Sequence, residues 1–157
     1  MGLFSIFKGP QDGGGGGDEP RASGKILQPS DITRDRLRAM FERAGLFLEL
    51  DKDGDIRVRD TFSAYVMPKA EGKQIRFFSL FNGKASASRA AKERLANKIN
   101  TTRHQPRACV TADGNFVFDQ TMVTEGGVTE DQIVRACRWH LSSLLTLAIL
   151  DKEDALA

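Results

Sequence analysis

The spacing of hydrophobic residues changes from helical to extended and back along the chain. Apolar side chains in residues 33–44 recur at helical spacing, which predicts a helix. From residue 46 onward they alternate with polar residues, and Asp53-Gly54 is a typical hairpin turn. Residues 62–66 continue as extended chain, and a further strand follows over residues 75–81. The first half is therefore predicted to be a helix followed by a three-strand antiparallel meander.

The second half repeats this alternation. Residues 88–102 predict a second helix, and Asp113-Gly114 predicts a second hairpin. The last helix is expected from residue 130 to about residue 150, because Thr129 and Gln132 form a capping box at its start. Its expected core stripe comprises Ile133, Cys137, Leu141, Leu144, Leu145 and Ala148. The order helix, three strands, helix, two strands, helix indicates an α+β fold with helices packed on an antiparallel sheet.

The ends of the chain differ in composition from its middle. Residues 1–29 contain an unbroken glycine run, and glycine loses more backbone entropy on folding than any other residue. We interpret this segment as a flexible leader, residues 30–151 as one α+β domain, and residues 152–157 as a C-terminal tail. The tip of the leader carries four apolar residues, Leu3, Phe4, Ile6 and Phe7. They form either a frayed terminus or an anchor that docks on a partner or on the domain itself.

Composition and motifs give no sign of a catalytic or metal site. The chain of 157 residues has a formal net charge of +2, too small to indicate nucleic acid or an anionic membrane as the partner. Its two cysteines and two histidines lack the spacing of zinc ligand pairs, and no serine nucleophile motif is present. Residues 49–60 resemble a calcium loop, but their flanks alternate as strands do. We therefore predict no enzyme activity, no catalytic residues, no metal and no cofactor.

Short motifs stand at the predicted turns and helix ends. They are Gly45, Asp51-Lys52-Asp53-Gly54-Asp55, Asn97-Lys98-Ile99-Asn100, Asp113-Gly114 and Glu125-Gly126-Gly127-Val128-Thr129. In this order they resemble the YbjN-like family of bacterial proteins over about residues 31–150. That family looks like the fold of type III secretion chaperones, which are small dimers that bind extended segments of client proteins. The resemblance implies this fold, a dimer, and a chaperone-like or regulatory role without catalytic residues.

The sequence carries more apolar side chains than one buried face per element requires. The last helix has a second apolar set beside its core stripe: Ala136, Trp139, Leu147 and Leu150. The strand over residues 75–81 is apolar on both sides, with Ile75 and Phe77 on one and Phe78 and Leu80 on the other. Either the domain's own helices cover both sides or a partner covers one of them. The partner-binding residues predicted from this surplus are Phe78, Leu80, Trp139 and Leu147.

These observations favour a non-enzymatic protein-binding module, chaperone-like or regulatory, that takes a protein client or a second copy of itself. Strand addition at a sheet edge is one mode of such binding. Two alternatives stay open: a regulator that binds nucleic acid through the basic faces of the first two helices, and a domain that binds a small ligand. Because no export signal and no membrane-spanning segment is recognised, we expect a cytoplasmic protein.

Overall fold

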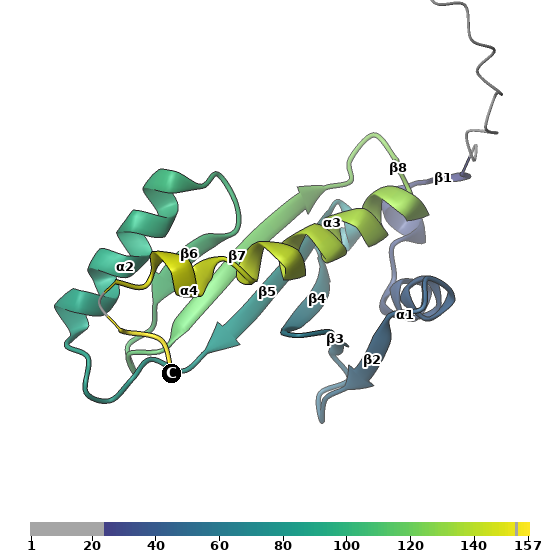
Figure 1. Ribbon diagram of the computed structural model, residues 1–157. Coiled ribbons are helices and arrows are strands. Elements are labelled where there is room, and N and C mark those ends of the chain that lie inside the picture. The colour runs from purple at the N-terminus through teal and green to yellow at the C-terminus, as the bar shows by residue number, and fades with distance from the viewer. Residues whose placement is uncertain (1–23, 153) are drawn as a thin grey trace, which may run out of the picture.

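Six antiparallel strands form one sheet in the computed structural model, which describes residues 24–152 and 154–157 (Figure 1). The spatial order is β2-β3-β4-β5-β7-β6. The strands are β2 (Phe47–Leu50), β3 (Ile56–Arg59), β4 (Ser63–Lys69), β5 (Gln74–Phe81), β6 (Arg107–Val110) and β7 (Phe116–Val123). Two short strands, β1 (Ile26–Leu27) and β8 (Val128–Thr129), pair with each other at the start of the last long helix.

The helices follow the predicted order, so the α+β class is confirmed. They are η1 (Pro29–Asp31), α1 (Arg34–Arg43), η2 (Ala70–Gly72), α2 (Arg89–Thr102), α3 (Glu130–Leu144) and α4 (Leu147–Leu150). The capping box at α3 is present, since Thr129 Oγ1 accepts from the N–H of Gln132 and Gln132 Oε1 accepts from the N–H of Thr129. These two bonds satisfy backbone N–H groups at the start of α3 that have no partner within the helix.

The structure has one strand more than the predicted meander. Residues 62–66 were expected to extend the preceding strand, but the chain reverses at Asp60, whose N–H donates to the carbonyl of Phe62 at 2.8 Å. The following residues then form β4, which pairs with β3 on one side and β5 on the other. No glycine or proline marks this reversal, which is why the sequence pattern did not reveal it.

The last helix is interrupted where a single helix to residue 150 was expected. Arg103 Nη1 donates to the carbonyl of Ser143 at 3.1 Å, and Arg103 also bonds Thr146 Oγ1. In an uninterrupted α-helix that carbonyl would accept from the N–H of Leu147. The turn at residues 145 and 146 leaves Leu145 54% exposed, so its place in the predicted core stripe is wrong.

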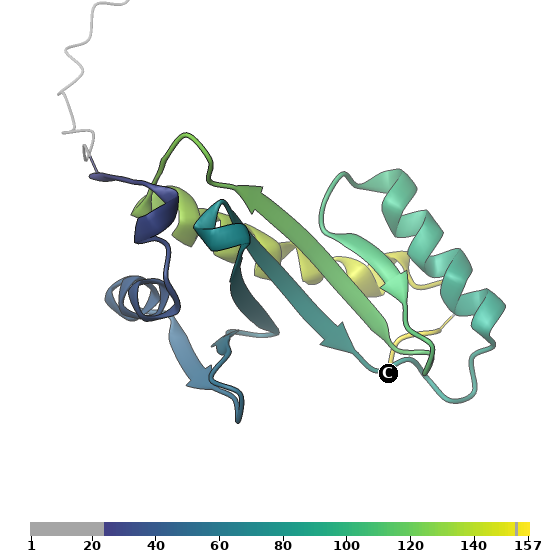
Figure 2. The ribbon, with the colours of Figure 1, turned by 180° about the vertical axis from the view of Figure 1, so that it is seen from behind.

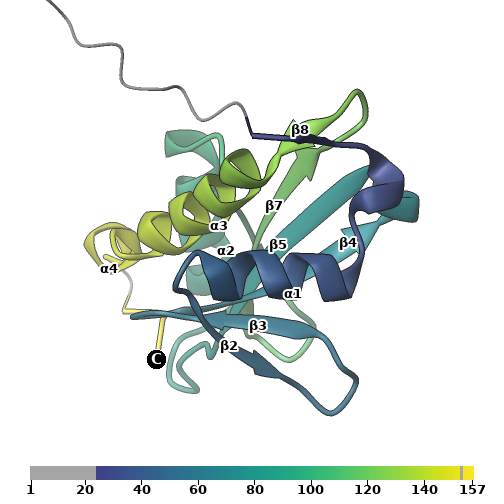
Figure 3. The same ribbon diagram turned by 90° about the vertical axis from the view of Figure 1, so that its right-hand side faces the viewer.

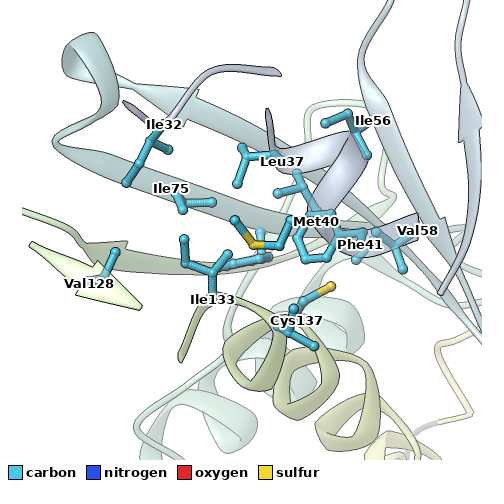
Figure 4. Close-up of a cluster of buried hydrophobic side chains, with 14 of the residues drawn as sticks. Ile32, Leu37, Met40, Phe41, Ile56, Val58, Ile75, Val128, Ile133 and Cys137 are labelled. Carbon is cyan, nitrogen blue, oxygen red and sulfur yellow. The ribbon is translucent and has the colours of Figure 1, made fainter. Parts of the chain in front are cut away.

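Hydrophobic side chains on one face of the sheet form two adjoining clusters. The first joins α1 and α3 to β3, β4 and β5 (Figure 4). The second lies beneath α2 and α4 and contains Phe116 and Phe118 of β7. Helices α1 and α3 are in contact with each other beside the sheet (Figure 3). The helices therefore share one face of the sheet, and the burial pattern of the strands reflects this one-sided cover.

Asn100 closes one edge of the sheet. Its side-chain amide donates to the carbonyl of Ala108 at 2.8 Å, and its Oδ1 accepts from the N–H of Ala108 at 2.7 Å. The amide thus takes the place that a further strand would occupy beside β6. An exposed row of backbone donors and acceptors favours edge-to-edge association, which this pair of bonds prevents at the middle of β6.

Candidate functional site

The face of the sheet opposite the helices is uncovered in the described part of the chain (Figure 2). Alternation along each strand sends every second side chain to this face, because successive Cβ atoms point to opposite sides. We call it the open face. Its members are Phe47, Glu49, Arg57, Arg59, Ser63, Tyr65, Met67, Lys69, Gln74, Arg76, Phe78, Leu80, Arg107, Cys109, Val117, Asp119, Thr121 and Val123.

The strand register aligns one residue from each strand in a single row across the open face. Tyr65 lies opposite Phe78, and Phe78 lies opposite Asp119. The row continues outward on both sides and comprises Glu49, Arg57, Tyr65, Phe78, Asp119 and Arg107. Directly opposed side chains in neighbouring strands are close enough to contact one another. We call these six residues the cross-sheet row.

The centre of the row is a stack of two rings between two guanidinium groups. The rings of Tyr65 and Phe78 are 5.0 Å apart and 15° from parallel. Arg57 lies 5.9 Å from the Tyr65 centroid, and Arg76 lies 4.9 Å from the Phe78 centroid. Arg76 Nε also donates to Asp119 Oδ2 at 2.6 Å. Cation–π contacts and this ion pair hold the side chains in place, so the row is organised before any partner binds.

Exposed apolar residues lie beside this row. Leu80 is 57% exposed and lies opposite the partly buried Val117 on the neighbouring strand. Phe47, on the edge strand β2, is 64% exposed. The open face also carries five cationic side chains (Arg57, Arg59, Lys69, Arg76 and Arg107) against two carboxylates (Glu49 and Asp119). The open face therefore combines exposed apolar surface with an excess of positive charge.

The structure divides the residues predicted from surplus apolar surface into three environments. Phe78 and Leu80 lie together on the open face. Trp139 lies on α3, on the helix side of the sheet, and is 47% exposed in a different site. Leu147 is only 2% exposed and packs in the second core cluster, so the expectation of an accessible side chain there is wrong.

The C-terminal residues explain why Leu147 is covered. Ala155 is fully buried in the same cluster as Leu147. The N–H of Lys84 donates to the carbonyl of Ala155, and the N–H of Ala157 donates to the carbonyl of Asn82, both at 2.9 Å. The end of the chain therefore packs against the start of the segment that follows β5. The sequence showed no pattern that would place residues 155–157 there.

Sequence reasoning missed most of the cross-sheet row. Tyr65 lies in a stretch that the pattern does not predict as a separate strand, and Arg57 is only a polar position in the alternation of the preceding strand. The usable signal was alternation, because Tyr65 and Met67 share a side of β4 just as Arg76 and Phe78 share a side of β5. Their alignment across strands depends on register, which no short-range pattern supplies.

A serine and a histidine do meet, but in the interior. Ser79 Oγ lies 3.0 Å from His140 Nε2 and donates to the carbonyl of Ser63 at 2.6 Å. Both residues are fully buried. Burial lowers the pKa of His140 from 6.5 to about 4, which disfavours its protonation. Burial also raises the pKa of Cys137 to about 12. The side chains of Ser79, His140 and Cys137 are part of the packed interior, where a substrate has no access to them.

Ion pairs occupy much of the basic surface of α1. Arg34 pairs with Asp55 at 2.7 Å. Arg36 and Arg43 both pair with Glu130, at 3.4 and 2.8 Å, and these contacts lower the pKa of that carboxyl. On α2, Arg89 pairs with Glu93 at 2.8 Å. Phosphate binding through these faces would have to compete with existing carboxylates, so the arrangement gives little support to the nucleic-acid alternative.

None of the helices in the described ranges combines the length and apolar character needed to cross a bilayer. Within the same residues, no cluster of three or more histidine, cysteine or acidic side chains is arranged as a metal site.

Comparison with known proteins identifies the family. The family model YbjN, described as "Putative bacterial sensory transduction regulator", matches residues 33–148. The fold is thus that of an α+β domain with a one-sided antiparallel sheet, and the chain belongs to the YbjN family. This confirms the resemblance drawn from the turn and cap motifs. No curated protein sequence gives a significant match.

Solved structures share the fold at low sequence identity. The crystal structure of YbjN, a putative transcription regulator from E. coli, matches with a TM-score of 0.65 at 18% identity, covering 80% of this chain and 96% of YbjN. An uncharacterized protein from Methanothermobacter thermautotrophicus matches with a TM-score of 0.54 at 9% identity, covering 78% and 98%. The HopA1-SchA chaperone–effector complex matches with a TM-score of 0.49 at 11% identity, covering 74% and 90%. That last likeness is too weak to support an argument about function.

Proposed function

We propose that this chain is a non-enzymatic protein-binding domain with a regulatory or chaperone-like role, and that its partner docks on the open face. The observation that carries the proposal is the exposed side chain of Leu80 beside the partly buried, preorganised ring of Phe78, on a sheet face without helix cover. Exposed apolar residues gathered on one surface mark interaction sites in soluble proteins. Membership of a family described as regulators supports the same class of function.

The charge of the face points to the chemistry of the partner. Cationic side chains outnumber carboxylates on it, so a segment with apolar residues flanked by Asp or Glu would be complementary. A second copy packed face to face would bring like charges together, which disfavours self-association through this surface. Single-stranded nucleic acid is less well suited, because the flat faces of Tyr65 and Phe78 are already covered by each other and by arginine.

A pair of synthetic peptides tests this proposal. One alternates leucine with aspartate, and the other replaces each aspartate with lysine. We expect the acidic peptide to bind the full chain saturably in a fluorescence-anisotropy titration, and the basic peptide to bind far more weakly. Added salt should weaken the acidic complex, since part of its affinity is electrostatic.

Matched leucine variants locate the binding surface. Leu80→Asp should weaken binding of the acidic peptide by about tenfold or more, because it removes apolar contact and adds a negative charge. Leu145→Asp is the control, since Leu145 is 54% exposed against 57% for Leu80 but lies on the helix side. Equal affinity for the two peptides, or equal losses in the two variants, would refute docking on the open face. Preference for a single-stranded oligonucleotide over the acidic peptide would favour the nucleic-acid alternative.

A further inference from the structure

The edge of the sheet beside α3 is open along half of one strand. Strand β6 pairs with β7 only as far as Asp119, while β7 continues to Val123 (Figure 1). The N–H of Thr124 donates to the carbonyl of Lys73, the residue before β5. The backbone N–H and C=O groups of the even-numbered residues of β7 therefore point toward β5. The backbone groups of Thr121 and Val123 therefore point to the other side. Among the described residues no strand pairs with them there.

A groove runs next to this unpaired edge. The groove lies between β7, α3 and the segment before β6, and it has a volume of about 560 Å³. Its wall on α3 is a single stripe at helical spacing, formed by Gln132, Arg135, Ala136 and Trp139, and Gln105 and Gln120 complete the lining. A strand added beside Thr121 and Val123 would send every second side chain into this groove.

One polar atom in the groove lacks a partner. Gln120 is only 7% exposed, and none of the residues that the structure describes donates a hydrogen bond to its Oε1. A buried acceptor without a donor destabilises the fold relative to one that accepts a hydrogen bond. The groove therefore offers a hydrogen-bond acceptor and an apolar surface at Trp139. An occupant with a hydrogen-bond donor between two apolar side chains would match both features.

We propose that residues 3–7 of this chain, Leu-Phe-Ser-Ile-Phe, occupy the groove by adding a strand to the free edge of β7. These residues lie outside the described part of the chain, and their sequence suits the site. In an extended segment Leu3, Ser5 and Phe7 share one side, which places a hydroxyl donor between two apolar side chains. The hydroxyl of Ser5 supplies the donor that Gln120 lacks, and the apolar side chains on either side of it supply contact with Trp139.

The position where the described chain starts is consistent with this occupant. Gly24 lies beside Thr129, and β1 pairs with β8 directly before α3. Trp139 lies ten residues further along, a distance of about 15 Å at the rise of an α-helix. Residues 8–23 connect Phe7 to Gly24, and a glycine-rich chain of that length spans about 22 Å on average. The segment can therefore reach the groove of its own domain.

Trp139 reports occupancy directly, because it is the single tryptophan of the chain. We expect the full-length protein to show tryptophan emission that acrylamide quenches poorly. The double variant Leu3→Asp/Phe7→Asp should show red-shifted emission and stronger quenching. Its matched control is Gly14→Asp/Gly16→Asp, which adds the same charge to the connecting segment and should behave as the unmodified chain.

Hydrogen exchange at the strand edge gives a second readout. The amides of Thr121 and Val123 should exchange about tenfold more slowly in the unmodified chain than in the Leu3→Asp/Phe7→Asp variant, if the segment is docked about 90% of the time. A synthetic peptide of residues 2–9 added to that variant should restore the slow exchange and the protected emission.

Three outcomes would overturn the inference. The first is identical quenching and exchange in the unmodified chain and the leader variant. The second is protection that appears only as protein concentration rises, which would assign the occupant to a second copy. The third is protection of the groove by the acidic peptide described above and not by residues 2–9. The open face is on the other side of the sheet, so Leu80→Asp should leave these readouts unchanged whether or not the proposed function holds.

Discussion

Replacing Phe118 with alanine should lower the free energy of unfolding by about 3–5 kcal/mol, because a large buried ring is lost. Phe118 is fully buried, and its ring meets Phe81 edge-on at 5.2 Å and stacks on Phe116 at 6.2 Å. The substitution removes apolar contact and leaves a cavity that neighbouring rings cannot fill by small movements. Urea-induced unfolding of the full-length chain, followed by circular dichroism, measures the loss.

Phe47 provides the matched control for this prediction. It is the same residue type on another strand of the same sheet, but it is 64% exposed. Phe47→Ala should change the free energy of unfolding by less than about 1 kcal/mol, because exposed side chains away from special contacts contribute little. Comparable losses for the two variants would mean that the second cluster is not packed as the structure shows it.

Lowering the pH from 7 to 4 should cost the fold about 3 kcal/mol through His140 alone. Burial lowers the pKa of this histidine from 6.5 to about 4, while the carboxylate of Asp119 acts weakly in the opposite direction. In the unfolded chain the imidazole binds its proton near its ordinary pKa. The unfolded state therefore takes up a proton between pH 6.5 and 4 that the folded state does not, and stability falls as pH decreases through this window.

Comparison of variants isolates the contribution of His140. His140→Leu should flatten the dependence of unfolding free energy on pH between 6.5 and 4, because the variant has no imidazole to protonate there. His104→Gln replaces the other histidine, which is exposed, and tests whether the effect is specific to His140. Carboxylates titrate over part of the same range, so the comparison uses differences between each variant and the unmodified chain. A His140→Leu curve parallel to that of the unmodified chain would contradict the buried, neutral state.

The class of fold and most of its elements could be predicted from the sequence alone. Helix starts were readable from side chains that act locally: Thr33, Ser88 and Thr129 each accept from a backbone N–H of the first turn. The two Asp-Gly pairs fixed the hairpins at residues 51–55 and 111–115 for the same reason, since a turn depends on a few consecutive residues. The family followed from those turns and caps, and the match over residues 33–148 confirms it.

The sequence also located part of the candidate site. A strand with apolar residues on both sides drew attention to Phe78 and Leu80, and the structure leaves both on the face without helices. The pattern could not tell which of the two sides the helices cover. Nor could it separate a second apolar stripe that lines a groove, as at Trp139, from one that becomes core, as at Leu147.

The answers to these questions come from the folded structure, because each depends on contacts between residues far apart in the chain. Leu147 is buried since residues near the C-terminus pack with it, and α3 ends where Arg103 reaches it from the end of α2. The cross-sheet row exists because strand register brings Tyr65, Phe78 and Asp119 into line. Local side-chain chemistry thus set the elements, whereas the register and the one-sided helix cover determined which face, edge and groove remain open to a partner.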